Sequence, residues 1–385
     1  MTIREPEISE APEVVGAPPT TSEEKVYVAS QWQLMWWRFR KHKMAGVGGV
    51  VLIIFYTLAI FCEFFAPFDP LKFDSRLVFA PPQAIRLRSV QGTWHWPPFI
   101  YGVKQQIDPV SYRRTYVADT SKVYNVRLFA RGDPYKLWGL IPSTIHLLGT
   151  EGNAGPMYLI GTDRMGRDML SRLIYGARIS LSIGLVGVFL SLIVGILIGG
   201  FSGYYGGIFD IIAQRIIEFL RSVPTLPLWM ALSAAVPPFW PPLQVYFGIT
   251  LVLSLIGWTG MARVVRGKFM ALREEDFVMA AKLAGSSEFR IVTRHMVPSF
   301  LSHIIASVTL SIPGMILGET SLSFLGVGLR PPVISWGVML QEGQNLATVA
   351  LSPWLLVPGL AVIATVLCFN FLGDGLRDAA DPYSR

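Results

Sequence analysis

The side chains of this sequence that could carry out chemistry are few, and they lie inside or beside long apolar runs. His303 falls within one such run, Glu319 closely follows it, and Ser323 adds a hydroxyl four residues further on. Arg221 ends a charged stretch and stands directly before a long uncharged one. An ionisable group in an apolar run can relay protons, and it can also serve as a hydrogen-bonded packing residue. We favour the packing role for His303 and keep proton relay open.

Motifs that would make the chain an enzyme are missing from the sequence. A phosphate-cradling loop has the pattern G-x-x-x-x-G-K-[ST], whose backbone and lysine hold a nucleotide. The only Gly-Lys pair is Gly267-Lys268, which is followed by Phe269 and lacks the first glycine. The sequence also contains no G-x-S-x-G, no H-E-x-x-H and no cluster of metal-ligating residues. We therefore expect a non-catalytic chain that binds no metal and does not hydrolyse ATP.

Composition indicates a membrane protein. Hydrophobic residues make up 52% of the 385 residues and charged residues only 15%, against about 25% in soluble domains. The 33 Lys and Arg residues outnumber the 26 Asp and Glu residues, and much of this excess flanks apolar runs. Such flanking charge orients membrane segments, so it does not indicate nucleic-acid binding. Cys62 and Cys368 both lie in apolar runs, and we expect no disulfide between them.

The apolar runs predict an all-α polytopic membrane protein with six transmembrane helices. A helix needs about 20 apolar residues to cross the hydrocarbon core. Two Pro-Pro pairs, 237–238 and 241–242, divide the longest uncharged stretch, which is too long for one crossing. Gly195 and Gly199 form a G-x-x-x-G pair that allows close helix packing. The predicted spans are 44–66 and, within a core of 161–373, about 179–201, two in 222–262, 296–318 and about 352–372.

The N-terminal segment 1–43 and the C-terminal segment 374–385 are expected in the cytoplasm, because Lys and Arg concentrate on that side of membrane proteins. Residues 1–25 are rich in glutamate and predict a disordered acidic tail without a cleavable signal peptide. The residues that share one face of the following helix are Trp32, Met35, Trp36 and Phe39. Basic residues crowd the same segment, so we expect an amphipathic helix in the headgroup plane. A simple polar lead-in to the first span is the alternative.

Residues 67–160 form a long insert between the first and second spans and are too polar to lie in the membrane. Between Tyr124 and Ala130 residues alternate with the period of a β-strand. The sequence Gly132-Asp133-Pro134 predicts a turn directly after it. We expect a small, partly β extracytoplasmic domain, since long loops cross the membrane largely regardless of charge. Its aromatic residues are interpreted as a small core, with a ligand cage as the alternative.

A charged segment, 263–298, separates two apolar runs in the second half of the chain. Between Glu274 and Ala284 it contains good helix formers and neither Gly nor Pro. The residues on one face of this helix are Phe277, Ala280, Ala281 and Ala284. The small residues of that face would let a partner approach the backbone closely. Gly285 can take the left-handed conformation that ends the helix, and Ser286 or Ser287 can cap a second helix.

Part of this segment resembles a known loop. The sequence Ala280-Ala281, followed by Gly285, His295 and Pro298, resembles the EAA loop of ABC-importer permeases. The resemblance implies a coupling helix that docks into a groove of an ATP-hydrolysing subunit. Met279 stands where that family usually has Glu, which puts in doubt any salt bridge made by that Glu. The residues assigned to ATPase coupling on this basis are Phe277, Met279, Ala280, Ala281, Gly285, His295 and Pro298.

Three further stretches resemble the dipeptide and oligopeptide branch of these permeases. They lie within residues 161–181, 319–337 and 373–382. The first stretch carries four charged residues that could form an ion-paired cap on the second span: Asp163, Arg164, Arg167 and Asp168. We favour this architectural role over contact with a substrate.

The resemblance implies a type I ABC-importer permease that works by alternating access and forms half of a pathway for oligopeptides or dipeptides in the bacterial inner membrane. The implied partners are a second, homologous permease, two ATP-binding subunits or one fused subunit, and a periplasmic or extracellular binding protein. ATP and Mg²⁺ would be bound by the ATPase subunits, so no cofactor is expected in this chain. The insert is a candidate dock for the binding protein. The candidate pathway or gate residues are His303, Glu319, Ser323 and Arg221.

Three other functions stay open at this point. A proton-coupled secondary transporter would use His303 or Glu319, and it predicts inverted internal repeats, which we do not find in the sequence. An ABC permease for oligosaccharides would share the same resemblance. A membrane scaffold or sensor with a ligand-binding outer domain would not require spans rich in Gly and Pro. Loss of uptake on ATP depletion, but not with a proton uncoupler, would exclude the proton-coupled transporter.

Overall fold

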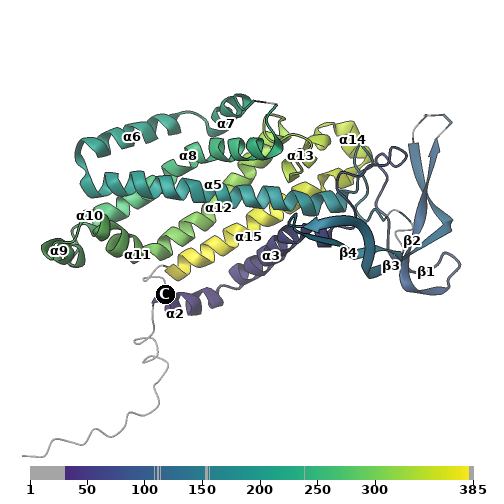
Figure 1. The fold of residues 1–385 in the computed structure, drawn as a ribbon, viewed down its shortest axis with the longest axis horizontal. Helices are drawn as coiled ribbons and strands as arrows, with labels where there is room; N and C mark the ends of the chain where they lie inside the picture. Colours follow the sequence, from purple (N-terminus) through teal and green to yellow (C-terminus); the bar gives the residue numbers. More distant parts are fainter. Residues whose placement is uncertain are drawn as a thin grey trace, which may run out of the picture.

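The computed structural model shows a bundle of long helices with a β-sheet at one end (Figure 1). We name the two ends of the bundle the sheet end and the α9 end, because α9 (Asp276–Leu283) lies opposite the sheet (Figure 1). The acidic tail predicted for residues 1–25 lies outside the described residues, as do the last five residues. The structure describes residues 31–107, 109–110, 112, 114–151, 155, 157–237 and 239–380.

Five helical segments in the described part of the chain are long and apolar enough to cross a membrane. They are α3 (Lys43–Ile60), α5 (Met169–Tyr205), α8 (Pro242–Leu272), α12 (Leu301–Phe324), and the 3₁₀ turn η4 (Pro353–Leu356) with α15 (Val357–Ala380). The shortest, α3, has 18 residues and measures about 27 Å. That length is close to the ~30 Å thickness of the hydrocarbon core. The predicted helical membrane architecture is confirmed.

The third predicted span is not one long helix. An amphipathic helix, α6 (Gly207–Ser222), is followed by a ten-residue apolar helix, α7 (Thr225–Ala234). Pro224 separates them, because proline removes a backbone donor and disfavours helical geometry at the residue before it. Val223 is accordingly extended, with φ of −87° and ψ of 134°. Thus only α7, with ten residues, lies where the third span was predicted, and α6 precedes that range.

Other helix boundaries differ from those predicted. Helix α8 runs to Leu272, so the first ten residues of the predicted loop 263–298 continue a helix that has no proline to stop it. Helix α12 starts after a backbone break at Phe300, with φ of −121° and ψ of 22°. It continues to Phe324 and therefore includes Glu319, which was predicted to follow the span. Helix α15 continues to Ala380, so the predicted C-terminal segment begins inside it.

Helices α5 and α8 pack closely against each other. A Cβ atom on Gly199 would lie 2.3 Å from the Ala262 carbonyl oxygen, and one on Gly203 would lie 2.6 Å from the Arg266 carbonyl oxygen. Together with Gly195, these glycines form a stripe with a period of four residues on α5. Only glycine allows two helix backbones to approach so closely. The close packing predicted from the G-x-x-x-G pair is confirmed.

The N-terminal helices lie against α15. Helix α2 (Gln31–Lys41) buries Met35 but leaves 58% of Trp36 exposed, although both were predicted on one face. Helix α3 meets α15 at Gly48, where a Cβ atom would lie 2.7 Å from the Cys368 carbonyl oxygen. Both cysteines of the chain are free thiols, as predicted.

The insert forms a four-stranded antiparallel sheet (Figure 1). Its strands, in spatial order, are β1 (Arg86–Arg88), β2 (Trp94–Ile107), β3 (Arg114–Leu137) and β4 (Ile141–Thr150). Three aromatic residues of the insert, Phe99, Tyr101 and Tyr158, are buried, as an aromatic core requires. Trp94 and Trp96 do not belong to this core, because they are 78% and 84% exposed.

The turn predicted at Gly132-Asp133-Pro134 is wrong, because β3 runs straight through these residues. The pairing with β4 shifts register between Arg131 and Tyr135, so the extra residues form a bulge instead of a chain reversal. A ring nitrogen of His146 on β4 lies 2.9 Å from the Asp133 carbonyl oxygen and stabilises this bulge. The chain reverses later, at Gly139, whose φ of +75° suits glycine.

The sheet is tied to the bundle near α4 (Cys62–Phe65), which follows α3. Arg178 of α5 donates to both oxygens of Glu63 at 2.7 Å. The indole N–H of Trp138 donates to the Ile60 carbonyl at 2.8 Å.

The short helices between α12 and α15 are α13 (Trp336–Gln341), the 3₁₀ turn η3 (Glu342–Gln344) and α14 (Leu346–Leu351).

Candidate functional site

Helix α9 ends in a glycine C-cap with two backbone hydrogen bonds. The Ser286 N–H donates to the Ala281 carbonyl at 3.1 Å, and the Gly285 N–H donates to the Lys282 carbonyl at 3.0 Å. Gly285 has a φ of +73°, a conformation that residues with a Cβ atom disfavour. The predicted helix stop at Gly285 is confirmed.

After this turn the chain leads to α12 through three short helical segments. They are α10 (Glu288–Arg290), the π-helical η2 (Ile291–Met296) and α11 (Val297–Ser299). Ser287 stands at the N-cap of α10, although its side chain makes no capping bond. His295 is half-buried in η2, and Pro298 is exposed in α11. Two of the seven residues assigned to coupling therefore lie on the connection to α12 and not on α9.

The inner side of α9 is anchored to the bundle mainly through Val278. Val278 is fully buried in an apolar cluster that includes Tyr204 of α5, Phe269 of α8, and Ile291 and Met296 of η2. Full burial of a valine side chain stabilises a fold by about 1.5–3 kcal/mol. The predicted face of Phe277, Ala280, Ala281 and Ala284 does not include Val278, although a lone Val between Phe277 and Met279 is a weak sign of an inward-facing position.

The other side of α9 faces away from the bundle. Leu283 is 88% exposed, Met279 47% and Phe277 40%. Ala280 is exposed as well. We call these four residues the α9 face. Ala281, predicted on the same face as Phe277 and Ala280, is half-buried and packs against the cluster around Val278 instead. A cluster of exposed apolar side chains, with small residues between them, indicates an interaction surface.

Two side-chain contacts connect the turn to the end of α5. The Lys282 ammonium lies 5.2 Å from the centre of the Tyr204 ring, within the range of a cation–π interaction. The Tyr205 hydroxyl donates to the Glu288 carboxylate. Because Tyr204 and Tyr205 are adjacent, a displacement of the turn acts directly on the end of α5. Sequence patterns could not reveal these pairs, since about 80 residues separate their partners.

An ion pair supports the same end of the bundle. Arg266 of α8 donates to both carboxylate oxygens of Asp210 on α6, each at 2.5 Å. The Ser202 hydroxyl of α5 donates to the same carboxylate. Three helices are thus joined at the base of the turn. The bidentate geometry gives the pair a fixed orientation as well as attraction.

Glu319, one of the four candidate gate residues, is completely buried in α12. The hydroxyls of Ser335 and Ser323 donate to one carboxylate oxygen at 2.7 and 2.8 Å, and Ser180 of α5 donates to the other at 3.3 Å. Ser180 also accepts the Trp336 N–H at 3.1 Å. The carboxylate therefore joins α12, α5 and the start of α13.

The four candidate gate residues do not form one site. Glu319 and Ser323 are in contact, whereas His303 precedes Glu319 by 16 residues in the same helix, which is about 24 Å. His303 is half-buried towards the α9 end. Arg221, at the end of α6, is exposed. A Cβ atom added to Gly260 of α8 would lie 4.0 Å from its guanidinium.

A buried ionic network lies at the start of α5. Arg167 donates to Asp163 at 2.6 Å, and Arg172 lies 3.3 Å from the same carboxylate. Arg167 also donates to Glu342 of η3 at 3.3 Å. Burial, together with the charge of Asp163, raises the pKa of Glu342 above its usual range. Of the predicted ion pairing, the pair of Asp163 and Arg167 is confirmed, whereas Asp168 bonds to Ser171 instead. The structure adds Glu342 as a long-range partner of Arg164 and Arg167.

Asp168 caps α5, as predicted for this charged stretch. One of its carboxylate oxygens accepts the Ser171 N–H at 2.7 Å and the Ser171 hydroxyl at 2.6 Å. Complete burial raises the pKa of Asp168 to about 6, and the hydrogen bonds from Ser171 partly oppose this rise. The charged side chains of this network bond to one another and to the backbone, in keeping with an architectural role.

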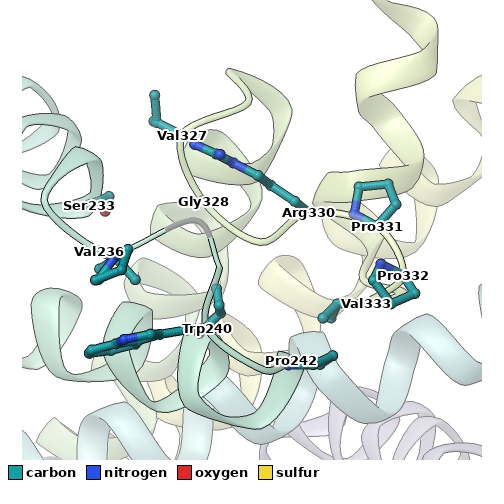
Figure 2. Close-up of a pocket in the computed structure, with 12 residues that line it drawn as sticks. Ser233, Val236, Trp240, Pro242, Val327, Gly328, Arg330, Pro331, Pro332 and Val333 are labelled. Carbon is teal, nitrogen blue, oxygen red and sulfur yellow. The ribbon is translucent and has the colours of Figure 1, made fainter.

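A small pocket lies where the α7–α8 connection meets the loop after α12 (Figure 2). Its volume is about 120 Å³. Trp240 and Pro242 line one side, Pro331 and Pro332 the other, and the Arg330 side chain extends across it (Figure 2). Sequence patterns place these prolines in turns and in a stretch with a family resemblance, and they do not predict that the prolines meet.

The described residues contain no group of three or more His, Cys, Asp or Glu side chains that could hold a metal ion. The polar side chains around Glu319 and Asp163 form hydrogen bonds and ion pairs within the chain.

Five helical segments long and apolar enough to cross a membrane, with a β-sheet at one end, define an integral helical membrane protein. A family model described as the binding-protein-dependent transport system inner membrane component matches residues 195–385. A second model, the N-terminal TM domain of oligopeptide transport permease C, matches residues 30–82.

Curated relatives agree with these matches. The chain is 31% identical over 372 residues to a dipeptide transport system permease protein of Lactococcus lactis, covering 96% of both chains. It is 40% identical to an oligopeptide transport system permease protein of Haemophilus influenzae, covering 59% of this chain and 71% of that one. A dipeptide permease of Bacillus subtilis is 39% identical, covering 61% and 72%. The chain belongs to the family of binding-protein-dependent transport system inner membrane components.

Proposed function

We propose that this chain is the permease subunit of a peptide-importing ABC transporter and forms half of its translocation pathway. The observation that carries the proposal is the α9 face, an exposed apolar surface on a helix whose opposite side is anchored by Val278. An ATP-hydrolysing subunit would dock on this face. Peptides are favoured as the substrate class, because the relatives are named as oligopeptide and dipeptide transport permeases.

The remaining assembly follows from this assignment. The other half of the pathway would come from a second, homologous permease, and ATP and Mg²⁺ would be bound by two ATPase subunits or one fused subunit. The α9 end and both termini would lie in the cytoplasm of a bacterium whose inner membrane holds the chain. The sheet end would then lie outside, where the insert offers a docking surface to a peptide-binding protein.

Helix α5 is suited to transmit movement between the two ends. At the α9 end, Tyr204 and Tyr205 contact Lys282 and Glu288 of the turn. Ser180, which lies 24 residues or about 36 Å earlier in the same helix, donates to the buried Glu319. Movement of the turn during ATP hydrolysis would therefore shift α5 against α12 and open the pathway alternately to either side.

Co-purification tests the coupling assignment. We expect Ala280→Arg to reduce the amount of ATPase subunit that co-purifies with the tagged chain at least tenfold, because a buried unpaired charge opposes docking. The matched control is Ala350→Arg, which places the same side chain on an exposed alanine of α14 near the sheet end. This control should retain the ATPase subunit at the wild-type level.

Uptake in proteoliposomes tests transport itself. Peptide uptake should require ATP on the side of the membrane that the α9 face occupies. It should continue when a proton uncoupler is present. Full retention of the ATPase subunit by Ala280→Arg would show that the α9 face is not the docking surface. Uptake abolished by the uncoupler but independent of ATP would replace the proposal with a proton-coupled transporter.

A further inference from the structure

An apolar groove runs along α3 and is bounded by α15. Its volume is about 780 Å³, and its walls include Leu52, Ile53 and Tyr56 of α3 together with Phe369 and Leu372 of α15. We call this feature the α3 groove. Its lining is overwhelmingly apolar apart from one end, where α2 joins α3.

Glycine keeps the groove open near that end. Gly46 and Gly49 both line the groove, and a Cβ atom on Gly46 would meet no atom within 4 Å. On Gly49 a Cβ atom would make only an ordinary contact of 3.7 Å with Leu372. Neither glycine is therefore required for packing within the chain. Gly48 differs, since it lies against the backbone of Cys368 and brings the two helices together.

The polar end of the groove is positively charged. Arg40 and Lys43 line it and are both exposed, and Trp36 lies beside them with 58% of its surface exposed. Nδ1 of His42 accepts the Ala45 N–H at 3.0 Å, so the neutral ring carries its proton on Nε2 and can donate there. The N-terminus of α3 adds its partial positive charge at the same place.

We propose that the α3 groove is a binding site for one anionic phospholipid. Its phosphate would lie between Arg40, His42 and Lys43 at the start of α3, where cationic side chains and a helix N-terminus together favour a phosphate. Its acyl chains would follow the apolar wall past Gly46 and Gly49. Trp36 would lie at the level of the headgroups, where tryptophan is favoured.

The dimensions of the groove limit how far a lipid reaches. One leaflet contributes about 15 Å of hydrocarbon, which corresponds to about ten residues of α3. Gly46 and Gly49 lie within this depth from Lys43. Thr57 also lines the groove, but it lies 14 residues or about 21 Å from Lys43, beyond the leaflet. The inference requires only a membrane around α3, so it stands whether or not the transported substrate is a peptide.

Native mass spectrometry of the full chain, purified in mild detergent with its associated subunits, tests the site. The probes are phosphatidylglycerol and phosphatidylcholine with identical acyl chains. We expect one phosphatidylglycerol to remain bound at concentrations at which phosphatidylcholine dissociates. Removing both charges, with Arg40→Gln and Lys43→Gln, should weaken binding roughly fivefold per charge.

Two substitutions of the groove lining complete the test. Gly46→Leu places a side chain in the groove at a position where a Cβ atom meets no atom within 4 Å. It should therefore abolish retention of phosphatidylglycerol without lowering the melting temperature. Thr57→Leu, the matched control at the far end, should retain it. Equal retention of both lipids, or unchanged retention by Gly46→Leu, would overturn the proposal. High-yield crosslinking of a Gly46→Cys variant to a second polypeptide in native membranes would do so as well, since a protein would then occupy the groove.

Discussion

At the scale of single residues, the structure separates polar groups that resemble one another in the sequence. Glu319 and His303 both occupy apolar surroundings in α12, yet only Glu319 is completely buried, and three serine hydroxyls donate to it. A carboxylate with several donors is satisfied as an anion and joins the elements that supply those donors. Glu319 therefore fits a structural link between α12, α13 and the first half of α5 better than a mobile proton carrier.

Glu319→Gln should lower stability by about 1–3 kcal/mol, because the amide nitrogen replaces an acceptor with a donor and leaves buried hydroxyls without a partner. The measurement is the thermal unfolding midpoint in detergent, together with ATP-driven uptake. Ser311→Ala serves as a control, since the Ser311 hydroxyl is exposed and donates only within its own helix. If the Gln variant were as stable as wild type but had lost proton-driven uptake, a proton-relay role would be supported instead.

At the scale of elements, the turn after α9 combines rigid and exposed features. Its backbone is fixed by the Gly285 C-cap and its inner side by Val278, while the α9 face stays outside. A rigid element transmits displacement better than a flexible loop, because little of the movement is lost in local rearrangement. For the same reason, replacing Gly285 with a residue that disfavours its left-handed backbone conformation should disturb the whole turn.

Gly285→Ala should weaken the turn by about 1–2 kcal/mol, because its φ of +73° is strained for a residue with a Cβ atom. Hydrogen exchange of residues 276–290 should become faster, and ATP hydrolysis should become less tightly linked to uptake. Gly267→Ala in α8 is the control: a Cβ atom there meets nothing within 4 Å, and alanine favours a helix interior. Equal exchange rates in the two variants would contradict the assigned role of the C-cap.

At the scale of the whole molecule, α5 is the element that connects the two ends. It contacts the turn through Tyr204 and Tyr205 and packs along α8 through its glycines. At its start, Arg172 pairs with Asp163 of the ionic network. With 37 residues it is about 55 Å long, longer than the hydrocarbon core. Forces applied at the α9 end can therefore reach the sheet end within one continuous helix.

Gly199→Ala should destabilise the bundle, because the new Cβ atom would lie 2.3 Å from the Ala262 carbonyl oxygen and force α5 and α8 apart. We expect a loss of about 1–3 kcal/mol, as for other overpacked positions, measured as a lower melting temperature in detergent. Gly187→Ala is the matched control on α5, since its Cβ atom would make an ordinary 3.5 Å contact with Met315. Equal melting temperatures for both variants would show that this crossing is not tightly packed.

The sequence by itself determined the features that depend on local periodicity and composition. Apolar runs of span length, the glycine stripe around Gly195 and Gly199, and the helix stop at Gly285 follow from the chemistry of neighbouring residues. The family resemblance of the loop and of the later motifs also rests on contiguous residues. These features need no knowledge of what lies opposite them in space.

Only the tertiary structure decided how distant segments meet. The link from Ser180 to Glu319, the pairing of Asp210 with Arg266, and the α3 groove all join residues that are far apart in the chain. The missed bulge at Gly132–Pro134 has the same origin, because the pairing of β3 with β4 overrides a local turn signal. Local chemistry sets what a segment can form, whereas packing and long-range pairing select among those possibilities.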